Sequence, residues 1–330
     1  MDLSEYRLLT IIVPTFERCD VLKDSLSRNV PYALPFKDKV RFFITDNASQ
    51  DDTEGVVMSM KKQYPDMIYY HKQDRNYGAD GNFKYGVANV NSKYVCLLGD
   101  EEVFSPYFFS YILGVIDRYP DVGEIHYNFL IGSMDFMVWH IFNNNMTNEM
   151  EHYYTVGKQF VYDMLNSPSL MSSNVFRRDL WIDSLKEEFD TPGYSWFSIL
   201  CRAAMKAPCF YASFPLIYQR FSGQHDYSEK MAWYMIYGMG HLMQALDKDI
   251  PGIFRHWQEK FQIEEKVHLV DFLFSMSHFK DFYKERYPKY IEPLLLDPKM
   301  HLLGRLSLKY SEKTLRRMLG WYYRFRSLRR

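Results

Sequence analysis

The sequence predicts an α/β protein in which a mostly parallel sheet is flanked by helices and followed by a helical C-terminal region. Three features indicate this fold. Short continuous apolar runs alternate with helix-spaced segments through the first 130 residues, as parallel strands joined by crossover helices do. Glycine, proline or polar residues end the runs. From Ser228 onward, almost every segment is compatible with a helix.

The strands are expected where apolar residues run continuously. One such run is "LLTIIVP" (Leu8–Pro14), which a proline ends, and the next is "VRFFITD" (Val40–Asp46). Continuous apolar runs of this length are typical of parallel strands that are buried on both faces. By the same pattern, further strands are expected at Met67–His71, Tyr94–Leu98 and Gly123–Phe129.

The first two helices are expected after the first two strands. Asp20 is the expected N-cap of a helix that continues to Val30 with apolar residues at helical spacing. Asp51 or Asp52 is expected at the start of a helix over Thr53–Tyr64, because aspartate side chains accept hydrogen bonds from the first turn.

Two more helices follow the third and fourth strands. The stretch "NYGADGN" is expected to break the pattern at Gly78 and Gly81, before a helix over Phe83–Val90. Ser105-Pro106 is an N-cap and first-turn pair for a helix that ends near Tyr119.

The middle of the chain is less regular. Residues 140–156 are polar and weakly patterned, which predicts a loop or an irregular strand. Strands are expected within residues 167–178 and over 209–221, the latter broken at its proline. Helices are expected at Asp179–Glu188 and Trp196–Ala207.

Charge is unevenly distributed along the 330 residues. The net charge is −1, but residues 301–330 hold nine basic residues and one acid, which leaves the rest of the chain strongly acidic. Six arginines of the stretch "RRMLGWYYRFRSLRR" alternate with aromatic and aliphatic residues. This mixture is typical of an anionic membrane surface, although a helix packed on the domain with a solvated basic face has the same pattern. A nucleic-acid partner is not expected, because the body is acidic and carries no nucleic-acid motif.

The compartment is expected to be the cytoplasm. The four cysteines show no metal-type spacing, and the simplest interpretation is that they are reduced. The first ten residues lack the basic start and apolar stretch of a signal peptide. No apolar run approaches 18 residues, so we expect no transmembrane helix.

Three carboxylates follow the fourth strand in "YVCLLGDEEVF". On an extended segment Asp100 and Glu102 would point the same way and Glu101 the opposite way. Two carboxylates at this spacing suit Mg²⁺ or Mn²⁺ held together with substrate phosphates, and the alternative is a solvated surface turn. Neither a dinucleotide fingerprint nor a P-loop is present.

Four motifs together resemble a known family. "TIIVPTFERCDVLKDSL", "FFITDNASQDDT", "RNYGADGNFKYGV" and "KYVCLLGDEE" are similar, in this order, to the motifs of family 2 glycosyltransferases of the GT-A fold, a Rossmann-like α/β fold. The resemblance covers roughly Leu9–Phe129, and more loosely continues to Phe221. It implies a catalytic domain over residues 1–222, with a nucleotide-sugar-binding half (1–130) and an acceptor-binding half (131–222). Residues 223–330 would be a separate helical region with the basic tail.

The resemblance also assigns roles to single residues. Glu102 departs from the aspartate that is usual at the second position of the family's Asp-x-Asp motif, and its longer side chain still reaches a metal. The implied roles are the base and ribose site for Pro14, Thr15 and Glu17, a hydrogen bond to the base for Asp46, contact with the nucleotide and donor sugar for Arg75, Asn76 and Gly81, and the ribose, pyrophosphate and metal for Asp100 and Glu102.

The catalytic base is expected downstream of the acid cluster. Family members often carry a Glu-Asp pair there, whereas "KEEFDTPGYSWF" offers Glu187, Glu188 and Asp190. We take Asp190 as the base, because it lies past the expected helix end beside Pro-Gly, while the two glutamates fit a solvated helix face. In "YQRFSGQHDYS", Arg220 is expected to pair with the diphosphate and His225 to act as a charge partner or metal ligand.

The resemblance implies transfer of a sugar from a nucleotide-sugar donor, with inversion and with Mg²⁺ or Mn²⁺. The Gln-x-x-Arg-Trp motif of processive members is absent, so we expect addition of one sugar, with a UDP-sugar favoured as donor. The expected acceptor is a glycan or lipid-linked oligosaccharide of bacterial surface polysaccharide synthesis, met at the inner face of the cytoplasmic membrane. The alternatives are a sugar nucleotidyltransferase, which normally has a glycine-rich N-terminal loop, and a degenerate transferase that only binds a glycan.

Overall fold

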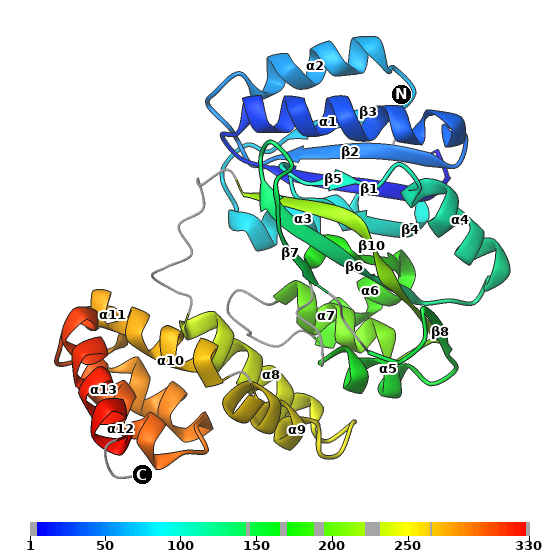
Figure 1. Cartoon of the computed structure of the whole chain (residues 1–330). Helices are drawn as coiled ribbons and strands as arrows, with labels where there is room; N and C mark the ends of the chain where they lie inside the picture. The colour runs from blue at the N-terminus through cyan, green and yellow to red at the C-terminus, as the bar shows by residue number, and fades with distance from the viewer. Residues whose placement is uncertain are drawn as a thin grey trace. The chain divides into compact units, whose positions relative to one another are not determined.

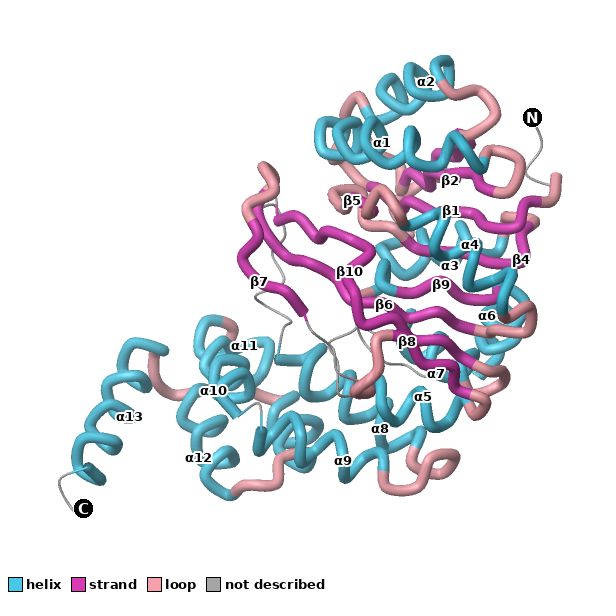
Figure 2. Tube along the Cα trace, turned by 45° about the vertical axis from the view of Figure 1, so that its right-hand side comes forward, coloured by secondary structure: helices cyan, strands magenta, loops and turns pink. Residues whose placement is uncertain are grey.

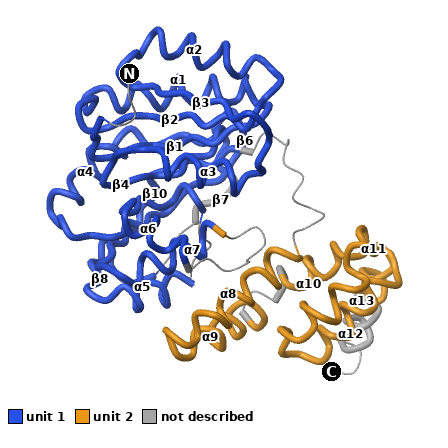
Figure 3. The backbone as a smooth tube through the Cα atoms, turned by 180° about the vertical axis from the view of Figure 1, so that it is seen from behind, with its two compact units in different colours: residues 1–188, 196–224 blue, residues 189–195, 225–330 orange. Residues whose placement is uncertain are grey.

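A computed structural model describes residues 5–142, 146–165, 170–187, 195–221, 232–264 and 266–327. The chain divides into two compact units (Figure 3). Unit 1 comprises Met1–Glu188 and Trp196–Gln224, and unit 2 comprises Phe189–Ser195 and His225–Arg330.

Unit 1 is built on one mixed sheet. In the part of the chain that the structure describes, the strand order is β3-β2-β1-β4-β9-β6-β10-β5, with β7 beside β6 and β8 beside β10 (Figures 1 and 2). β1 pairs in parallel with β2 and β4, and β2 pairs in parallel with β3, so the predicted α/β class is confirmed. β9 is antiparallel to both β4 and β6. The strands are β1 (Arg7–Thr15), β2 (Val40–Asp46), β3 (Ile68–Lys72), β4 (Ser92–Leu97), β5 (Val103–Phe104), β6 (Glu124–Ser133), β7 (Val138–Phe142), β8 (Glu151–Tyr154), β9 (Asn174–Arg177) and β10 (Cys209–Phe221).

Helices cover both faces of this sheet (Figure 1). Leu9 and Ile11 of β1 share one buried cluster with apolar residues of α1, α2 and α4, whereas Ile12 faces α3. At that contact a Cβ on Gly86 of α3 would lie 2.5 Å from Ile12 Cγ2, so glycine allows the helix to approach the sheet closely. Cover on both faces explains why β1 and β2 are continuous apolar runs. The helices of unit 1 are α1 (Cys19–Ala33), α2 (Thr53–Gln63), α3 (Gly78–Ala88), α4 (Phe108–Arg118), α5 (Gly157–Met164), α6 (Arg178–Ser184) and α7 (Ser195–Ala204).

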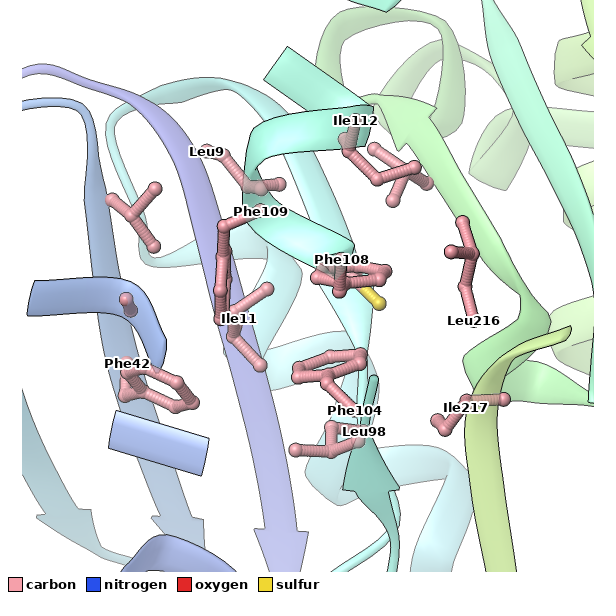
Figure 4. Packing of buried hydrophobic residues seen from close by; sticks show 14 of the residues in the cluster. Leu9, Ile11, Phe42, Leu98, Phe104, Phe108, Phe109, Ile112, Leu216 and Ile217 are labelled. Carbon is pink, nitrogen blue, oxygen red and sulfur yellow. The ribbon is translucent and has the colours of Figure 1, made fainter. Parts of the chain in front are cut away.

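An aromatic cluster anchors α4 to the sheet (Figure 4). Phe104 of β5 and Phe108 of α4 stack with ring centroids 3.8 Å apart, and Phe109 meets Phe108 edge to face at 5.0 Å. All three rings are buried. Each fully buried phenylalanine contributes roughly 1.5–3 kcal/mol. This cluster fixes the chain directly after the acid residues 100–102.

Three helix starts differ from the prediction. The N-cap of α1 is Arg18 and not Asp20, which lies inside the first turn. α3 begins at Gly78, so the two glycines lie within the helix and do not interrupt the pattern before it. The N-cap of α4 is Tyr107, two residues after Ser105. Ser105 nevertheless accepts two hydrogen bonds at the start of α4, from the backbone N–H of Tyr107 to its Oγ at 3.3 Å and from that of Phe108 to its carbonyl at 2.9 Å. The two-residue differences at α1 and α4 are of the size by which helix ends usually vary.

The middle of the chain adds strands to the same sheet. β8 and the end of β7 lie in residues 140–156, which were expected to form a loop or an irregular strand, and the residues between 142 and 146 lie outside the described part. β10 continues through Pro215 as one strand beside β6, with register shifts on either side of the proline. The predicted break there is therefore wrong, because a bulge accommodates the proline without ending the strand.

Unit 2 is helical in its described residues, as predicted. Its last helix packs through Leu315, which is 1% exposed, and through Arg316, which pairs with Asp271 at 3.1 Å. No helix in the described residues is long and apolar enough to cross a membrane. The α-helices are α8 (Met239–Leu246), α9 (Ile253–Glu259), α10 (Lys266–Ser275), α11 (Lys280–Tyr283), α12 (Pro298–Ser307) and α13 (Glu312–Ser327).

Candidate active site

The loops after β1, β2, β3 and β4 meet at one edge of the sheet. Parallel pairing places Thr15 beside Asp46 and Asp46 beside Lys72, so the carboxyl ends of these strands are neighbours. Thr15 Oγ1 donates a hydrogen bond to Asp100 Oδ2 at 2.9 Å, which joins the loops after β1 and β4. The predicted convergence of the strand-end loops is therefore present, at the position where open α/β sheets bind ligands.

Asp46 is a buried carboxylate that organises the loop after β2. Its Oδ1 accepts from the backbone N–H of Ser49 at 2.9 Å, and its Oδ2 accepts from the hydroxyl of Tyr70 at 2.6 Å. Burial, and then the neighbouring Asp46, raise the pKa of Tyr70 far above its usual value, which keeps this hydroxyl a donor. Ser49 Oγ in turn accepts from the backbone N–H of Glu17 at 2.8 Å. Glu17 has a φ of 52°, a left-handed conformation that a non-glycine residue adopts only when its surroundings impose it.

Amide side chains hold the loop after β3. Asn47 Nδ2 donates to Asn76 Oδ1 at 2.8 Å, and Asn47 Oδ1 accepts from the backbone N–H of Tyr77 at 2.8 Å. Arg75 is exposed and lies over the Tyr77 ring, 4.7 Å from its centroid. A Cβ on Gly81 would lie 2.7 Å from Tyr77 Cβ, so a larger residue there would displace this ring. Asn76, Arg75 and Gly81 thus belong to one loop structure with Tyr77.

A cavity of about 710 Å³ opens beside this loop. It extends along α3 past Gly81 to Tyr85, whose ring stacks on His71 with centroids 4.6 Å apart, and it reaches Leu185. Tyr77 also lines the cavity. Flat aromatic faces beside polar side chains are compatible with a sugar or a base.

The acid residues after β4 do not alternate as predicted. The backbone N–H of Glu102 donates to Gly99 O at 3.0 Å, so the segment is a tight turn and not an extended strand. Asp100 and Glu101 both face Arg18: its Nη1 lies 2.6 Å from Asp100 Oδ1, and its Nη2 pairs with Glu101 Oε2. The expectation that Asp100 and Glu102 point the same way is therefore wrong.

Glu102 turns toward the core. Its Oε2 accepts from the backbone N–H of Gly99 at 2.7 Å, and the side chain is 6% exposed. Burial raises the pKa of this carboxyl to about 7. A Cβ on Gly99 would lie 2.8 Å from Glu102 Oε2, which explains the glycine at this position. The backbone carbonyl of Glu102 accepts hydrogen bonds from Ser25 Oγ and Asn29 Nδ2 of α1 at 2.8 and 2.9 Å.

Arg220 reaches the same turn from the end of β10. It is 1% exposed, and its Nε donates to Glu101 O at 2.6 Å. Its Nη1 pairs with Asp24 of α1. Its Nη2 is buried and has no hydrogen-bond partner among the described residues. Strand pairing thus brings a guanidinium from far along the chain to the acid turn.

Several predicted residues cannot be placed. Asp190, Glu188 and His225 lie outside the described residues, as does the side chain of Glu187. The residues that sequence reasoning missed are Arg18, Asp24, Ser49, Tyr70 and Tyr77. Of these residues, Arg18 could most readily have been identified from the sequence, since it is the single cation in the loop "VPTFERCD" after the first strand.

Two carboxylates at this edge are compatible with a divalent ion. The described residues contain no group of three or more histidine, cysteine or acidic side chains arranged around a metal. Mg²⁺ and Mn²⁺ need fewer protein ligands than that when substrate phosphates supply the others. Asp100 and Glu101, which already share one cation in Arg18, meet this requirement.

The mixed α/β sheet, whose strand-end loops gather buried carboxylates, amides and arginines at one edge, has the architecture of the GT-A fold. The chain belongs to glycosyl transferase family 2, whose family model matches residues 10–180. This match includes the strand ends of β1 to β4 and the acid turn.

Curated proteins of similar sequence are named as glycosyltransferases. GalNAc(5)-diNAcBac-PP-undecaprenol beta-1,3-glucosyltransferase of Campylobacter jejuni is 31% identical over 94 residues, which are 28% of this chain and 29% of that protein. The alignments span about a third of the length of the curated relatives that the chain matches.

Two solved structures share the fold over most of the chain. S. aureus TarS (1–349) in complex with UDP has a TM-score of 0.60 at 12% identity and covers 95% of this chain and 91% of that one. The mannosyltransferase PcManGT of Pyrobaculum calidifontis, in complex with GDP-Man and Mn²⁺, has a TM-score of 0.57 at 15% identity and covers 86% and 77%. At these identities the likeness concerns the fold.

Proposed function

We propose that this protein is an inverting, non-processive glycosyltransferase that moves one sugar from a nucleotide-sugar donor to a hydroxyl of a glycan or lipid-linked acceptor. The observation that carries the proposal is the convergence of Thr15, Asp46 and Asp100 at one sheet edge through parallel pairing and the Thr15–Asp100 hydrogen bond. Family membership supports the reaction class. A UDP-sugar is the favoured donor, and bacterial surface polysaccharide synthesis is the proposed setting.

The nucleotide would lie across the ends of β1, β2 and β3. Pro14, Thr15 and Glu17 would border the base and ribose, and Asp46 would accept a hydrogen bond from the base. Both oxygens of Asp46 already accept one internal bond each, and a carboxylate oxygen has capacity for a second. The ordered loop with Arg75, Asn76 and Gly81 would extend along the nucleotide and the donor sugar, next to the cavity beside α3.

The diphosphate would lie at the acid turn. Asp100 would hold Mg²⁺ or Mn²⁺ there, with Glu102 in the arrangement proposed from the motif or with Glu101 in the arrangement that the turn favours. The ion would supply charge neutralisation of the leaving diphosphate. Arg220 would donate its unpartnered Nη2 to a phosphate oxygen, and His225 would add a further charge partner or metal ligand.

The acceptor would enter through residues 131–222, the proposed acceptor-binding half. Asp190 would take the proton of the acceptor hydroxyl as the oxygen attacks the anomeric carbon. The bond between that carbon and the diphosphate oxygen breaks on the opposite face, so the anomeric configuration inverts. The nucleoside diphosphate leaves with the bonding electron pair.

The acceptor would be met at the inner face of the cytoplasmic membrane. The C. jejuni relative is named for an acceptor that carries PP-undecaprenol, which supports a lipid-linked acceptor. The basic, aromatic tail would hold the protein peripherally on anionic lipid.

Transfer from a panel of nucleotide sugars with Mn²⁺ tests the proposal. The wild type should consume one donor only when an acceptor is supplied, and Asp100→Asn should lose this activity. Asp20→Asn is the matched control, since Asp20 is exposed on α1. Pyrophosphate-dependent release of a sugar phosphate would point instead to a nucleotidyltransferase, and glycan binding without turnover would point to a degenerate transferase.

Two matched variants separate the possible metal ligands. If Glu101 is the second carboxylate, Glu101→Gln should weaken Mn²⁺ binding more than Glu102→Gln does. The reverse order would support the Asp100–Glu102 pair. A thermal-shift screen of nucleoside diphosphates identifies the nucleotide independently, because a ligand at 100 times its Kd stabilises the folded state by about 2.7 kcal/mol.

A further inference from the structure

Arg18 occupies the position at the acid turn where a cation is needed. Its guanidinium bridges Asp100 and Glu101, and its side chain is 12% exposed while each carboxylate side chain is 6% exposed. Arg18 is the N-cap residue of α1, so the first turn of that helix sets where the side chain starts. The bridge therefore joins the loop after β1 to the turn after β4.

The Arg18 guanidinium supplies positive charge between the two carboxylates, as a metal ion would. Two neighbouring carboxylates with little solvent repel each other unless a positive charge lies between them. Arg18 Nη1 holds Asp100 Oδ1, while Asp100 Oδ2 accepts from Thr15 Oγ1 at 2.9 Å. Both oxygens of Asp100 are thus engaged, and a divalent ion bound to Oδ1 would be pressed against the guanidinium.

A second guanidinium beside the turn points to an anionic ligand. Arg220 is bound to the backbone carbonyl of Glu101, and its buried Nη2 has no partner in the described part of the chain. A buried donor without an acceptor is costly, and a phosphate oxygen would satisfy it. The turn thus has carboxylates for a metal and a free donor for the phosphates that accompany it.

We propose that Arg18 is the resident counter-ion of the acid turn and that it competes with the divalent ion for Asp100 and Glu101. This inference rests on the proposed function, because it assumes that the turn binds the metal of the donor complex. Before the donor binds, Arg18 keeps the two carboxylates together and the turn ordered. When the metal and diphosphate arrive, the guanidinium leaves the carboxylates and becomes available to the phosphates, which compensates for the broken ion pairs. Arg18 is therefore a positioning residue that sets the affinity for the metal.

The test measures Mn²⁺ binding to the full chain without nucleotide, by electron paramagnetic resonance of the free ion. Arg18→Gln removes the competing charge, so the Kd for Mn²⁺ should fall on the order of tenfold, which lies within the usual range of coupling between two sites. The same variant should have a lower Tm than the wild type in EDTA, and added Mn²⁺ should raise its Tm by more than it raises that of the wild type. Arg118→Gln is the matched control, because Arg118 is half exposed and pairs with Glu151 at 3.0 Å, not with the acid turn. Its Mn²⁺ affinity should equal that of the wild type.

Folded Arg18→Gln protein that binds Mn²⁺ no more tightly than the wild type would overturn the inference. If that variant does not fold, Arg18→Met takes its place, because it also removes the charge and keeps a long side chain that can pack in the same position. Mn²⁺ should again bind more tightly than to the wild type. Equal or weaker binding by folded Arg18→Met would exclude competition. Because the assay contains neither donor nor acceptor, its outcome is separate from whether the protein transfers a sugar.

Discussion

We expect His126 to make the stability of unit 1 sensitive to acid. It lies on β6, is fully buried, and packs against Tyr211 and Phe160. Its Nδ1 is 2.8 Å from Asn174 Oδ1. Asn174 Nδ2 donates to Leu170 O, so Oδ1 of Asn174 accepts and Nδ1 of the histidine carries the proton. Burial lowers the pKa of His126 from 6.5 to about 4.

The sign and size of the effect follow from these two pKa values. The folded state binds the imidazolium proton only near pH 4, whereas the unfolded chain binds it near pH 6.5. Stability is therefore fully present above pH 6.5 and falls as the pH drops toward 4. The loss in the free energy of unfolding is about 2 kcal/mol at pH 5 and approaches about 3 kcal/mol below pH 4.

Urea unfolding followed by circular dichroism at pH 7.5 and pH 5 measures the loss. His126→Asn keeps an amide donor near Asn174 but cannot be protonated. Between the two pH values the wild type should lose about 2 kcal/mol more than this variant does. Comparing each protein with itself cancels the constant cost of the smaller side chain. His71→Asn is the matched control, because it removes a partly exposed histidine from the same unit by the same substitution. Equal losses in the free energy of unfolding for the wild type and His126→Asn would refute the reasoning. An NMR titration of the His126 ring with a midpoint near 6.5 would refute it as well.

Three further predictions concern other parts of the chain. Burial raises the pKa of Glu124 well above 4.5, so its contribution to stability is present below pH 4.5 and is lost as the pH rises above that value. Glu124→Gln should flatten this decline in the urea-measured free energy of unfolding, and an unchanged slope would contradict the prediction. If Asp190 is the base, Asp190→Asn should lose turnover on the order of 10²-fold or more in steady-state assays while still binding nucleotide, whereas near-normal turnover would move the role to Glu187, Glu188 or His225. Truncation after Lys313 should abolish co-sedimentation with anionic liposomes at low salt; a full-length protein that stays in the supernatant, or a truncated one that pellets equally, would leave the tail a purely structural element.

Local pattern was sufficient to predict the framework of the site. Continuous apolar runs identified β1 and β2, because strands covered on both faces need apolar residues at every position. The order of strands and helices then placed Thr15, Asp46 and Asp100 at the same sheet edge, since parallel strands end together. The motifs at these ends were also enough to identify the family.

The contacts within the site were decided by tertiary structure. The turn at Gly99 brought Glu101 to Arg18 and sent Glu102 into the core, which alternation along a strand could not predict. Pairing of β10 with β6 carried Arg220 to the carbonyl of Glu101, 119 residues earlier in the chain. The physical reason is that periodicity records which side chains are buried, whereas the partner of a buried charge depends on distant segments that only the folded chain brings within hydrogen-bond distance.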